Sequence, residues 1–414
     1  MESEISVSGF RFHGKAASSM KPKERMQSIS LAIMVADTVL KESYRQAAAS
    51  VNYSLHRDDE HAMIPATIQA RTLALGHAMT ESLMKEASAV LEANGVDTAT
   101  GIIDDRSGIP GTARTPRLPE DVSGDRTAEV VAACNADREG RERILHMEKV
   151  RHTEASAKGS VYISVDGVGV KHQKEVRQAG KEKDGRYVEN TVVHIKADEG
   201  QYTLTATGMN NAFKVLVAFL LANRLMENRR LIFLTDGAKD IKACIETFFS
   251  FREYTVILDY LHLKKKCKEL MSMATKGTGK DRKERADNKK QILRGLLRIL
   301  WEGNVPEAIG YLNEIDPRNI SNPGILKQVV EYLERKSGHI ACYAFRQKMG
   351  LRISSNRVEK ANDLLVAKRQ KDDGMSWSEK GSGALAIIAA ANVNGKLHSW
   401  FRGEREWLKL PEAA

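Results

Sequence analysis

Three acidic residues stand where a folded chain could bring their carboxylates together. Asp166 follows the run VYISV, Asp236 follows the run LIFLT, and Glu359 lies in the first turn of a helical segment. Carboxylates that share one site repel each other unless a divalent cation joins them. Mg²⁺ takes hard oxygen ligands and keeps positions open for water and phosphate oxygens. The three residues are therefore candidate catalytic ligands of Mg²⁺, or of Mn²⁺, in phosphodiester chemistry.

Each of these acids also has a purely structural interpretation. Asp166-Gly167 could form the two-residue turn of a hairpin between two strand-like runs. Asp236 could cap the helix that follows it. Glu359 could be the N3 residue of a capping box that Asn356 begins. The sequence leaves these alternatives open beside the metal-binding interpretation.

Two further acids compete with Glu359 for the place of third ligand. Asp363 lies one helical turn later on the same predicted face, and Glu379 in SWSEKG is a weaker rival. Trp377, in the same short segment as Glu379, could stack on an extruded base. Packing against a helix is the more ordinary role for such a tryptophan.

The segment LDYLHLKKKC places Asp259, His262 and Cys267 close together in the chain. An Asp-x-x-His pair with a nearby cysteine could be part of a zinc site. Three dispersed ligands without a fourth are weak evidence for zinc, and a histidine at a helix end is usually structural. We expect Asp259 and His262 to support the acidic site and Asp259 to cap a helix.

The surrounding segments predict a mixed α/β sheet. VYISVDGVGV is rich in β-branched residues, and ENTVVHIKADEGQYTLTATG predicts a hairpin around Asp198-Glu199-Gly200. RRLIFLTDG and YTVILD are short apolar runs typical of central strands covered on both faces. Helical segments separate them, so the order is three strands, helix, strand, helix, strand. In such sheets, reactive groups gather at the carboxyl ends of the strands.

The chain is long enough for two or three domains. The segments lacking strand patterns are helical or rich in Gly, Pro, Asp and Thr. We predict six segments along the chain. The first three are a helical N-terminal region with a DNA-binding role (1–96), a linker or loop (97–126) and a connecting helix (127–152). The last three are the first part of the core (153–262), a basic helical insertion (263–350), and the last part of the core with the glutamate helix and a C-terminal helix (351–414).

Charge is unevenly distributed along the chain. The net charge is +10, with −4 over residues 1–150 and +14 over residues 151–414, and the excess peaks between Lys264 and Arg298. A basic block of this kind indicates a phosphate-backbone partner, although a solvated helical surface is the alternative. The candidate DNA contacts are Lys264, Lys265, Lys266, Lys268, Lys289, Lys290, Lys368 and Arg369.

Several protein classes do not fit the sequence. There is no run of 18 apolar residues that would predict a membrane span. The N-terminal stretch carries acids and has no apolar core, which is not typical of a secretory signal. The four cysteines form no CxxC pair, which argues against a disulfide framework and favours a reducing cytoplasm.

Taken in order, SVDGVGV, FLTDGAKDI, LDYLHLKKKC and NRVEKANDLLVAKRQKDDGMSWSEKGSGAL resemble a bacterial insertion-sequence transposase of the DDE class, closest to the Mutator-like and related groups. The resemblance covers roughly residues 155–400. It implies an RNase H-like core with a helical insertion before the final glutamate. It also implies that Asp166, Asp236 and Glu359 form the metal-binding triad.

The spacing is compatible with that resemblance. Asp166 and Asp236 are 70 residues apart, and Asp236 and Glu359 are 123 apart, so an inserted helical segment is needed if all three share one site. The resemblance implies a transposase that cuts and joins DNA by Mg²⁺-dependent phosphoryl transfer, acting on transposon ends and target DNA. Such a protein would work as a homo-oligomer on DNA, in the cytoplasm of a prokaryote and associated with its nucleoid.

The N-terminal region departs from the expected pattern. Residues 1–150 are slightly acidic and hold one cysteine, whereas many relatives carry a Cys-rich or helix-turn-helix DNA-reading region there. Two other functions therefore stay open. One is a catalytically inactive or host-adopted DNA-binding derivative, and the other is an RNase H-like nuclease that cuts without joining strands.

Overall fold

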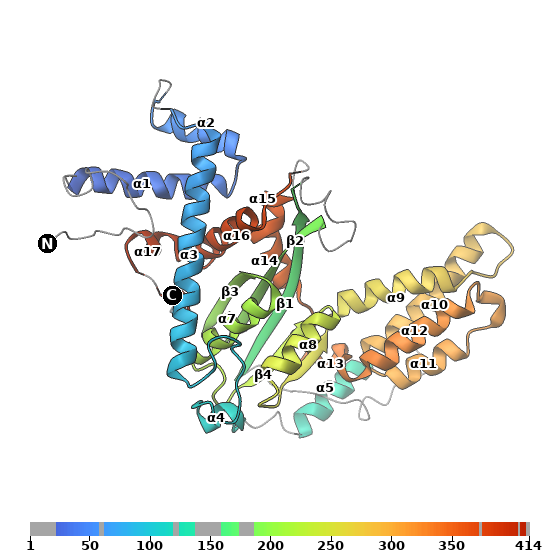
Figure 1. The fold of residues 1–414 in the computed structure, drawn as a ribbon. Helices are drawn as coiled ribbons and strands as arrows, with labels where there is room; N and C mark the ends of the chain where they lie inside the picture. The colour runs from blue at the N-terminus through green and yellow to red at the C-terminus, as the bar shows by residue number, and fades with distance from the viewer. Residues whose placement is uncertain are drawn as a thin grey trace.

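A computed structural model describes residues 22–57, 62–118, 124–136, 159–173, 186–371, 375–404 and 406–410. A five-stranded sheet lies at its centre (Figure 1), in the order β3-β2-β1-β4-β5. β1 and β2 are antiparallel, as are β2 and β3, whereas β4 runs parallel to both β1 and β5. The strands are β1 (Ser160–Lys171), β2 (Tyr187–Ala197), β3 (Gly200–Thr207), β4 (Arg230–Thr235) and β5 (Thr255–Leu258). The prediction of a mixed α/β sheet that opens with an antiparallel meander is confirmed.

Strand β1 is longer than the sequence pattern predicts. It continues through Asp166 and Gly167 to Lys171, and both residues pair with β2, opposite Val192 and Thr191. The alternative of a hairpin turn at Asp166-Gly167 is therefore excluded, and the expectation that this strand ends at Asp166 is wrong. The run of alternating small and β-branched residues keeps the chain extended past the acid.

One face of the sheet packs against helices and carries the larger apolar core. Val161, Ile163 and Val165 of β1 point to this side because alternate residues of a strand share a face. They are fully buried together with residues of α3, α7 and α8. The covering helices are α3 (Pro65–Ala93), α7 (Met209–Ala222) and α8 (Lys239–Phe248).

The N-terminal helices contribute to two apolar clusters. The long helix α3 stands beside the sheet (Figure 1) and packs closely against α16. At their crossing, a Cβ on Gly76 would lie 2.4 Å from the Cα of Ala384, so only glycine permits this approach. Val51 of α2 is buried instead in a smaller cluster with Val168 of β1. The helices around α3 are α1 (Pro22–Val39), α2 (Tyr44–Ser54), α16 (Glu379–Val393) and α17 (Leu397–Phe401).

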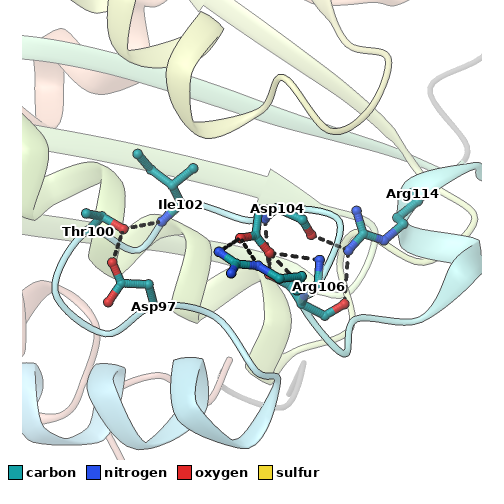
Figure 2. A network of polar contacts seen from close by, with 7 residues as sticks. Asp97, Thr100, Ile102, Asp104, Arg106 and Arg114 are labelled. Atoms are coloured by element: carbon teal, nitrogen blue, oxygen red, sulfur yellow. Dashed lines mark hydrogen bonds and ion pairs between the residues drawn. The ribbon is translucent and has the colours of Figure 1, made fainter.

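Residues 97–118 form an ordered loop packed on the core. Val96, Ile103, Ile109 and Ala113 are buried in the larger apolar cluster. Figure 2 shows the polar contacts that fold this loop, in which Asp104 accepts from Arg106 and Ser107. Of the two alternatives predicted for 97–126, a linker or a loop, residues 97–118 form a loop, in which Asp, Thr and Gly build side-chain-to-backbone turns.

Further contacts in the same loop complete the network in Figure 2. Asp97 accepts from the backbone of Ala99 and the hydroxyl of Thr100, and Arg114 donates to the carbonyls of Asp104 and Ser107. The short helix α4 (Gly111–Arg114) closes the loop.

A helical arm extends away from the sheet between β5 and the glutamate helix (Figure 1). Its apolar residues form a second cluster that reaches Ile232 and Leu234 of β4. The structure thus places only helices over the span predicted as a helical insertion, apart from one isolated bridge between Thr275 and Ile320. The arm contains α9 (Tyr260–Ala274), α10 (Arg282–Trp301), α11 (Val305–Asn313), η3 (Pro317–Asn319), α12 (Pro323–Lys336), η4 (Ser337–His339) and α13 (Tyr343–Lys348).

The remaining helices connect the arm and the sheet. Helix α5 (Gly124–Ala136) packs on α13 through Val130 and Cys134, and the rest of the predicted connecting helix lies outside the described residues. After the arm come α14 (Asn356–Asn362), the π-helical turn η5 (Asp363–Ala367) and α15 (Lys368–Gln370). Within the described ranges, no helix combines the length and apolar character needed to cross a membrane.

Candidate active site

The two aspartates lie on neighbouring strands at the same level of the sheet. Ser164 of β1 pairs with Leu234 of β4 in the last parallel pair between these strands. Asp166 and Asp236 each come two residues after that pair, so both side chains leave the same face. This face also receives α14 and the start of the helical arm. The structure therefore brings these two predicted residues together.

Asp236 sits in a tight turn between β4 and α8. Its Oδ1 accepts from the backbone N–H of Ala238 at 2.8 Å, and Gly237 has φ +85°. Only glycine adopts this backbone conformation without strain. Helix α8 begins at Lys239 with Ala238 as its N-cap, so the prediction that Asp236 is the N-cap is wrong. Within the described part of the chain, no group donates a hydrogen bond to the other carboxylate oxygen of Asp236.

The helical arm supports this turn through a lysine that sequence analysis missed. The Nζ of Lys336, at the end of α12, donates to the carbonyl of Gly237 at 2.6 Å, although the side chain is only 7% exposed. Burial lowers the pKa of Lys336, whereas the nearby charge of Asp236 raises it. Its position on an otherwise amphipathic helix gives no sequence signal for this contact.

Glu359 reaches the site from α14 but is engaged by another side chain. Its Oε1 lies 2.9 Å from Nε2 of His262, which belongs to the first turn of α9. The N-cap of α14 is Ser355, so Glu359 is the fourth helical residue and does not reach back to the backbone. The alternative of a capping box begun by Asn356 is excluded, because the helix starts one residue earlier than that motif requires and Asn356 is its first residue.

Asn362 is the residue of α14 that touches the first aspartate. Its Nδ2 donates to Oδ2 of Asp166 at 2.5 Å. The side chain is 7% exposed, and its Oδ1 is buried without a hydrogen-bond partner among the described residues. Asn362 lies three residues after Glu359, so both face the same side of the helix. That spacing is the signal in the sequence that points to Asn362, although an asparagine is a less obvious metal-site residue than an acid.

Asp259 links the two helices that carry His262 and Glu359. It is fully buried and caps α9, with Oδ1 accepting from the backbone of Leu261 at 2.6 Å and His262 at 3.1 Å. Its Oδ2 accepts from the hydroxyl of Ser355 at 2.8 Å and from the backbone N–H of the same residue. One carboxylate thus ties the start of the His262 helix to the start of the Glu359 helix. The predicted helix-capping role of Asp259 is confirmed.

The electrostatics of Asp166 reflect this crowding of acids. Burial raises the pKa of Asp166, and the negative charges of Asp236 and Glu359 raise it further. A backbone hydrogen bond from Gly167 and the proximity of His262 oppose these effects. Ionised Asp166 therefore destabilises the folded state, and destabilising charges of this kind are typical of functional sites.

This shift gives a stability prediction for Asp166→Asn in metal-free buffer. A carboxyl whose pKa is higher in the folded than in the unfolded chain stabilises the fold when protonated. That contribution is lost as the pH rises through the folded pKa. Ionised Asp166 therefore opposes folding at pH 7, and we expect the variant to melt at a higher temperature than wild type there. The difference should shrink as the pH falls through the raised folded-state pKa of Asp166, towards the range in which an unfolded Asp titrates, about 4. A melting temperature that is lower at pH 7, or a difference independent of pH, would contradict this.

The donor set suits a hard divalent cation. Asp166, Asp236 and Glu359 supply carboxylate oxygens, and the orphaned Oδ1 of Asn362 is a neutral oxygen of the same kind. In the described part of the chain, no three His, Cys, Asp or Glu side chains converge closely enough to hold a metal ion as they stand. The aspartates form a pair, whereas the Glu359 carboxylate is turned to His262.

The competing candidates are not among the groups whose charges act on Asp166. Asp363 and Glu379 are exposed at the starts of η5 and α16. Cys267 is buried in the apolar cluster of the arm, where desolvation raises its thiol pKa to about 12. Among the described residues, it belongs to no group of three His, Cys, Asp or Glu side chains that could hold a metal ion.

The tryptophan of GMSWS has a packing role. Trp377 is 6% exposed, and its Nε1 donates to the carbonyl of Gln370 at 2.9 Å. The guanidinium of Arg369 lies 5.2 Å from its ring centroid and also donates to the carbonyl of Val39. Arg369 is itself 6% exposed, so the prediction that it contacts DNA is incompatible with its position.

The other basic candidates lie on the arm and beyond α14. Lys264, Lys265 and Lys268 on α9 are exposed, as are Lys290 on α10 and Lys368 on α15. Lys266 pairs with Glu269 at 3.4 Å, and Lys289 donates to the carbonyl of Ser272 at 2.6 Å. The arm thus presents a row of available cations on α9, directly after His262.

Comparison with known proteins gives one result that bears on this site. No curated protein matches the chain. A family model described as an uncharacterised protein family, UPF0236, matches residues 132–409, which is about two thirds of the sequence and includes all three acids and the helical arm. The chain belongs to the uncharacterised protein family UPF0236.

Proposed function

We propose that this protein is a DDE-type transposase that cuts and joins DNA at insertion-sequence ends. The observation that carries the proposal is the placement of Asp166 and Asp236 at matching positions of two adjacent parallel strands, with Glu359 brought to the same face by α14. The sheet order, with three antiparallel strands followed by two parallel ones, supports an RNase H-like core. The helical arm lies between the second and third acids, as the resemblance to Mutator-like transposases implies.

The residues divide into roles that follow from their contacts. Asp166, Asp236 and Glu359 would hold divalent cations, Mg²⁺ or Mn²⁺, which when bound supply charge neutralisation for phosphodiester chemistry. Asn362 orients Asp166 through its amide. His262 orients Glu359, and Asp259 fixes both helices that carry this pair. Exposed lysines of α9 would position the DNA backbone without specifying its sequence.

The reaction would proceed in two phosphoryl transfers at this site. Water first attacks a phosphodiester at the transposon end and leaves a free 3′-hydroxyl. That hydroxyl then attacks a phosphodiester of target DNA, and the new bond replaces the broken one. Strand joining would require two DNA segments at once, so we propose a homo-oligomer on DNA in a prokaryotic nucleoid.

Cleavage in the presence and absence of metal tests this function. The substrate is duplex DNA carrying the sequences that flank the coding region on both sides. We expect Mg²⁺-dependent cuts that leave 3′-hydroxyl ends, complete loss in EDTA, and recovery with Mg²⁺ or Mn²⁺. Cutting that persists in EDTA, or the absence of cutting with either ion, would exclude the proposal. Cutting without any joined product would instead identify a nuclease.

A further inference from the structure

The face of the sheet that carries the two aspartates continues into a polar, positively charged surface. Tyr162 pairs with Lys196, and Lys196 pairs with Gln201, so these three residues form one row across β1, β2 and β3. Ser164, His194 and Thr203 form the next row, and Asp166 begins the third. At about 3.3 Å per residue, the first row lies roughly 13 Å from Asp166 along β1.

Two arginines from the segment before and within α14 cover this row. The guanidinium of Arg352 lies 5.5 Å from the ring centroid of Tyr162. Arg357, an exposed residue of α14, donates through Nη1 to Oε1 of Gln201 at 3.2 Å. With Lys196, three cationic side chains from three different segments gather over β1, β2 and β3.

The floor of this surface is an imidazole that is neutral at neutral pH. His194 is 6% exposed, and its Nδ1 lies 3.3 Å from the hydroxyl of Thr203. Its Nε2 is buried with no hydrogen-bond partner in the described part of the chain. Burial, together with the charges of Arg352, Arg357 and Lys196, lowers the pKa of His194 to about 4. The three cations therefore lie over a buried imidazole that is uncharged at neutral pH and does not balance their charge.

The protein supplies little to balance these cations. Burial and the charge of Arg357 lower the pKa of Arg352, so the two guanidinium groups repel each other. The carboxylate that acts on Tyr162 is Asp198, which already lies 3.5 Å from Arg229 and accepts from the backbone of Gly159 at 3.0 Å. Among the described residues, no carboxylate forms an ion pair with Lys196, Arg352 or Arg357. Such a cluster is stabilised when an external anion binds it.

We propose that Lys196, Arg352 and Arg357 form a subsite for the phosphodiester backbone of the DNA strand that enters the active site. The subsite lies on the aspartate face, and Arg357 is two residues before Glu359, so a bound strand would run along β1 towards Asp166. At about 3.4 Å of helix axis per nucleotide, the 13 Å separation corresponds to roughly four nucleotides. This inference rests on the proposed function, since it assigns a contact for that reaction's substrate.

The salt dependence of DNA binding tests the subsite without any cleavage. The probe is a fluorescein-labelled mixed-sequence duplex, measured by anisotropy in EDTA over a range of salt concentrations. The test protein carries Lys196→Gln, Arg352→Gln and Arg357→Gln. The control carries Arg117→Gln, Lys380→Gln and Arg402→Gln, which removes the same formal charge from exposed positions elsewhere. Each lost phosphate contact lowers the slope of log K against log salt by about 0.9.

We expect the slope to fall by about 2–3 in the test protein and to stay within about 0.5 of wild type in the control. Arg357→Gln alone, an exposed change that does not disturb packing, should lower the slope by about 1. Equal slopes in wild type, test and single variant would overturn the subsite and leave the proposed function standing. A wild-type protein that does not bind DNA at low salt would overturn both, whereas a cleavage failure with normal slopes would overturn the function alone.

Discussion

Replacing Asp236 with asparagine is expected to abolish DNA cleavage, with a rate at least about a thousandfold below wild type. That loss corresponds to about 4 kcal/mol of transition-state stabilisation, which is a reasonable value for a group that holds a catalytic cation. The amide is nearly isosteric and can still accept from the backbone of Ala238, as Oδ1 of Asp236 does. The turn should therefore survive, and circular dichroism and melting temperature should stay close to wild type.

A matched control distinguishes the loss of Asp236 from the general loss of a negative charge nearby. Asp240 is an exposed residue in the first turn of α8, four residues further along. Asp240→Asn removes the same charge nearby and should cut within about twofold of wild type. In the same assay, Glu359→Gln should lose activity as strongly as Asp236→Asn, while Asp363→Asn should retain it. A silent Glu359→Gln with an inactive Asp363→Asn would reverse the assignment of the third acid.

The second large effect is expected from Asp259→Ala, which should lower the free energy of unfolding by about 3–5 kcal/mol. The alanine leaves three backbone N–H groups and the Ser355 hydroxyl without their acceptor in a fully buried place. Hydrogen bonds to a charged group are worth about 1.5–3 kcal/mol each, and orphaned donors add to the cost. The measurement is urea denaturation followed by circular dichroism.

Asp281 provides the control for simple helix capping. It caps α10 by accepting from Glu284 at 2.8 Å, but it is exposed and joins no second helix. Asp281→Ala should therefore cost only about 1 kcal/mol. If the two substitutions cost the same, Asp259 is only a cap, and its link to the Glu359 helix through Ser355 contributes nothing measurable.

Local patterns were sufficient to predict much of the fold. Alternating and apolar runs gave the strands, and the lack of such runs over 263–350 gave the helical arm. The meeting of the two aspartates was predictable from neighbouring parallel strands, although only Asp236 follows its strand. Asp166 lies inside β1, two residues past the last pair that β1 makes with β4. The polar composition of 97–118 predicted a linker or a loop, but it did not predict that three spaced apolar side chains would anchor this loop on the core.

The contacts that depend on long-range packing could not be predicted. Asn362 meets Asp166 across 196 residues of sequence, and Lys336 meets the Gly237 carbonyl across 99. The sequence around Asn362 and Lys336 contains no pattern that predicts these long-range hydrogen bonds. Arg369 was assigned to DNA from its charge, but the fold buries it between Tyr44 and Trp377. The type of a side chain therefore predicts its binding role only when the packing of the fold leaves that side chain exposed.

The central claim is that Asp166 and Asp236 bind one divalent cation between them. A crystal structure of the protein soaked in Mn²⁺, with anomalous scattering recorded at the manganese edge, tests it most directly. The account predicts an anomalous peak within about 2.0–2.4 Å of oxygens from both aspartates, with Glu359 released from His262 towards the ion. The same soak of Asp236→Asn should show no peak there. A wild-type map without a peak at these residues, or with manganese bound only elsewhere, would contradict the account.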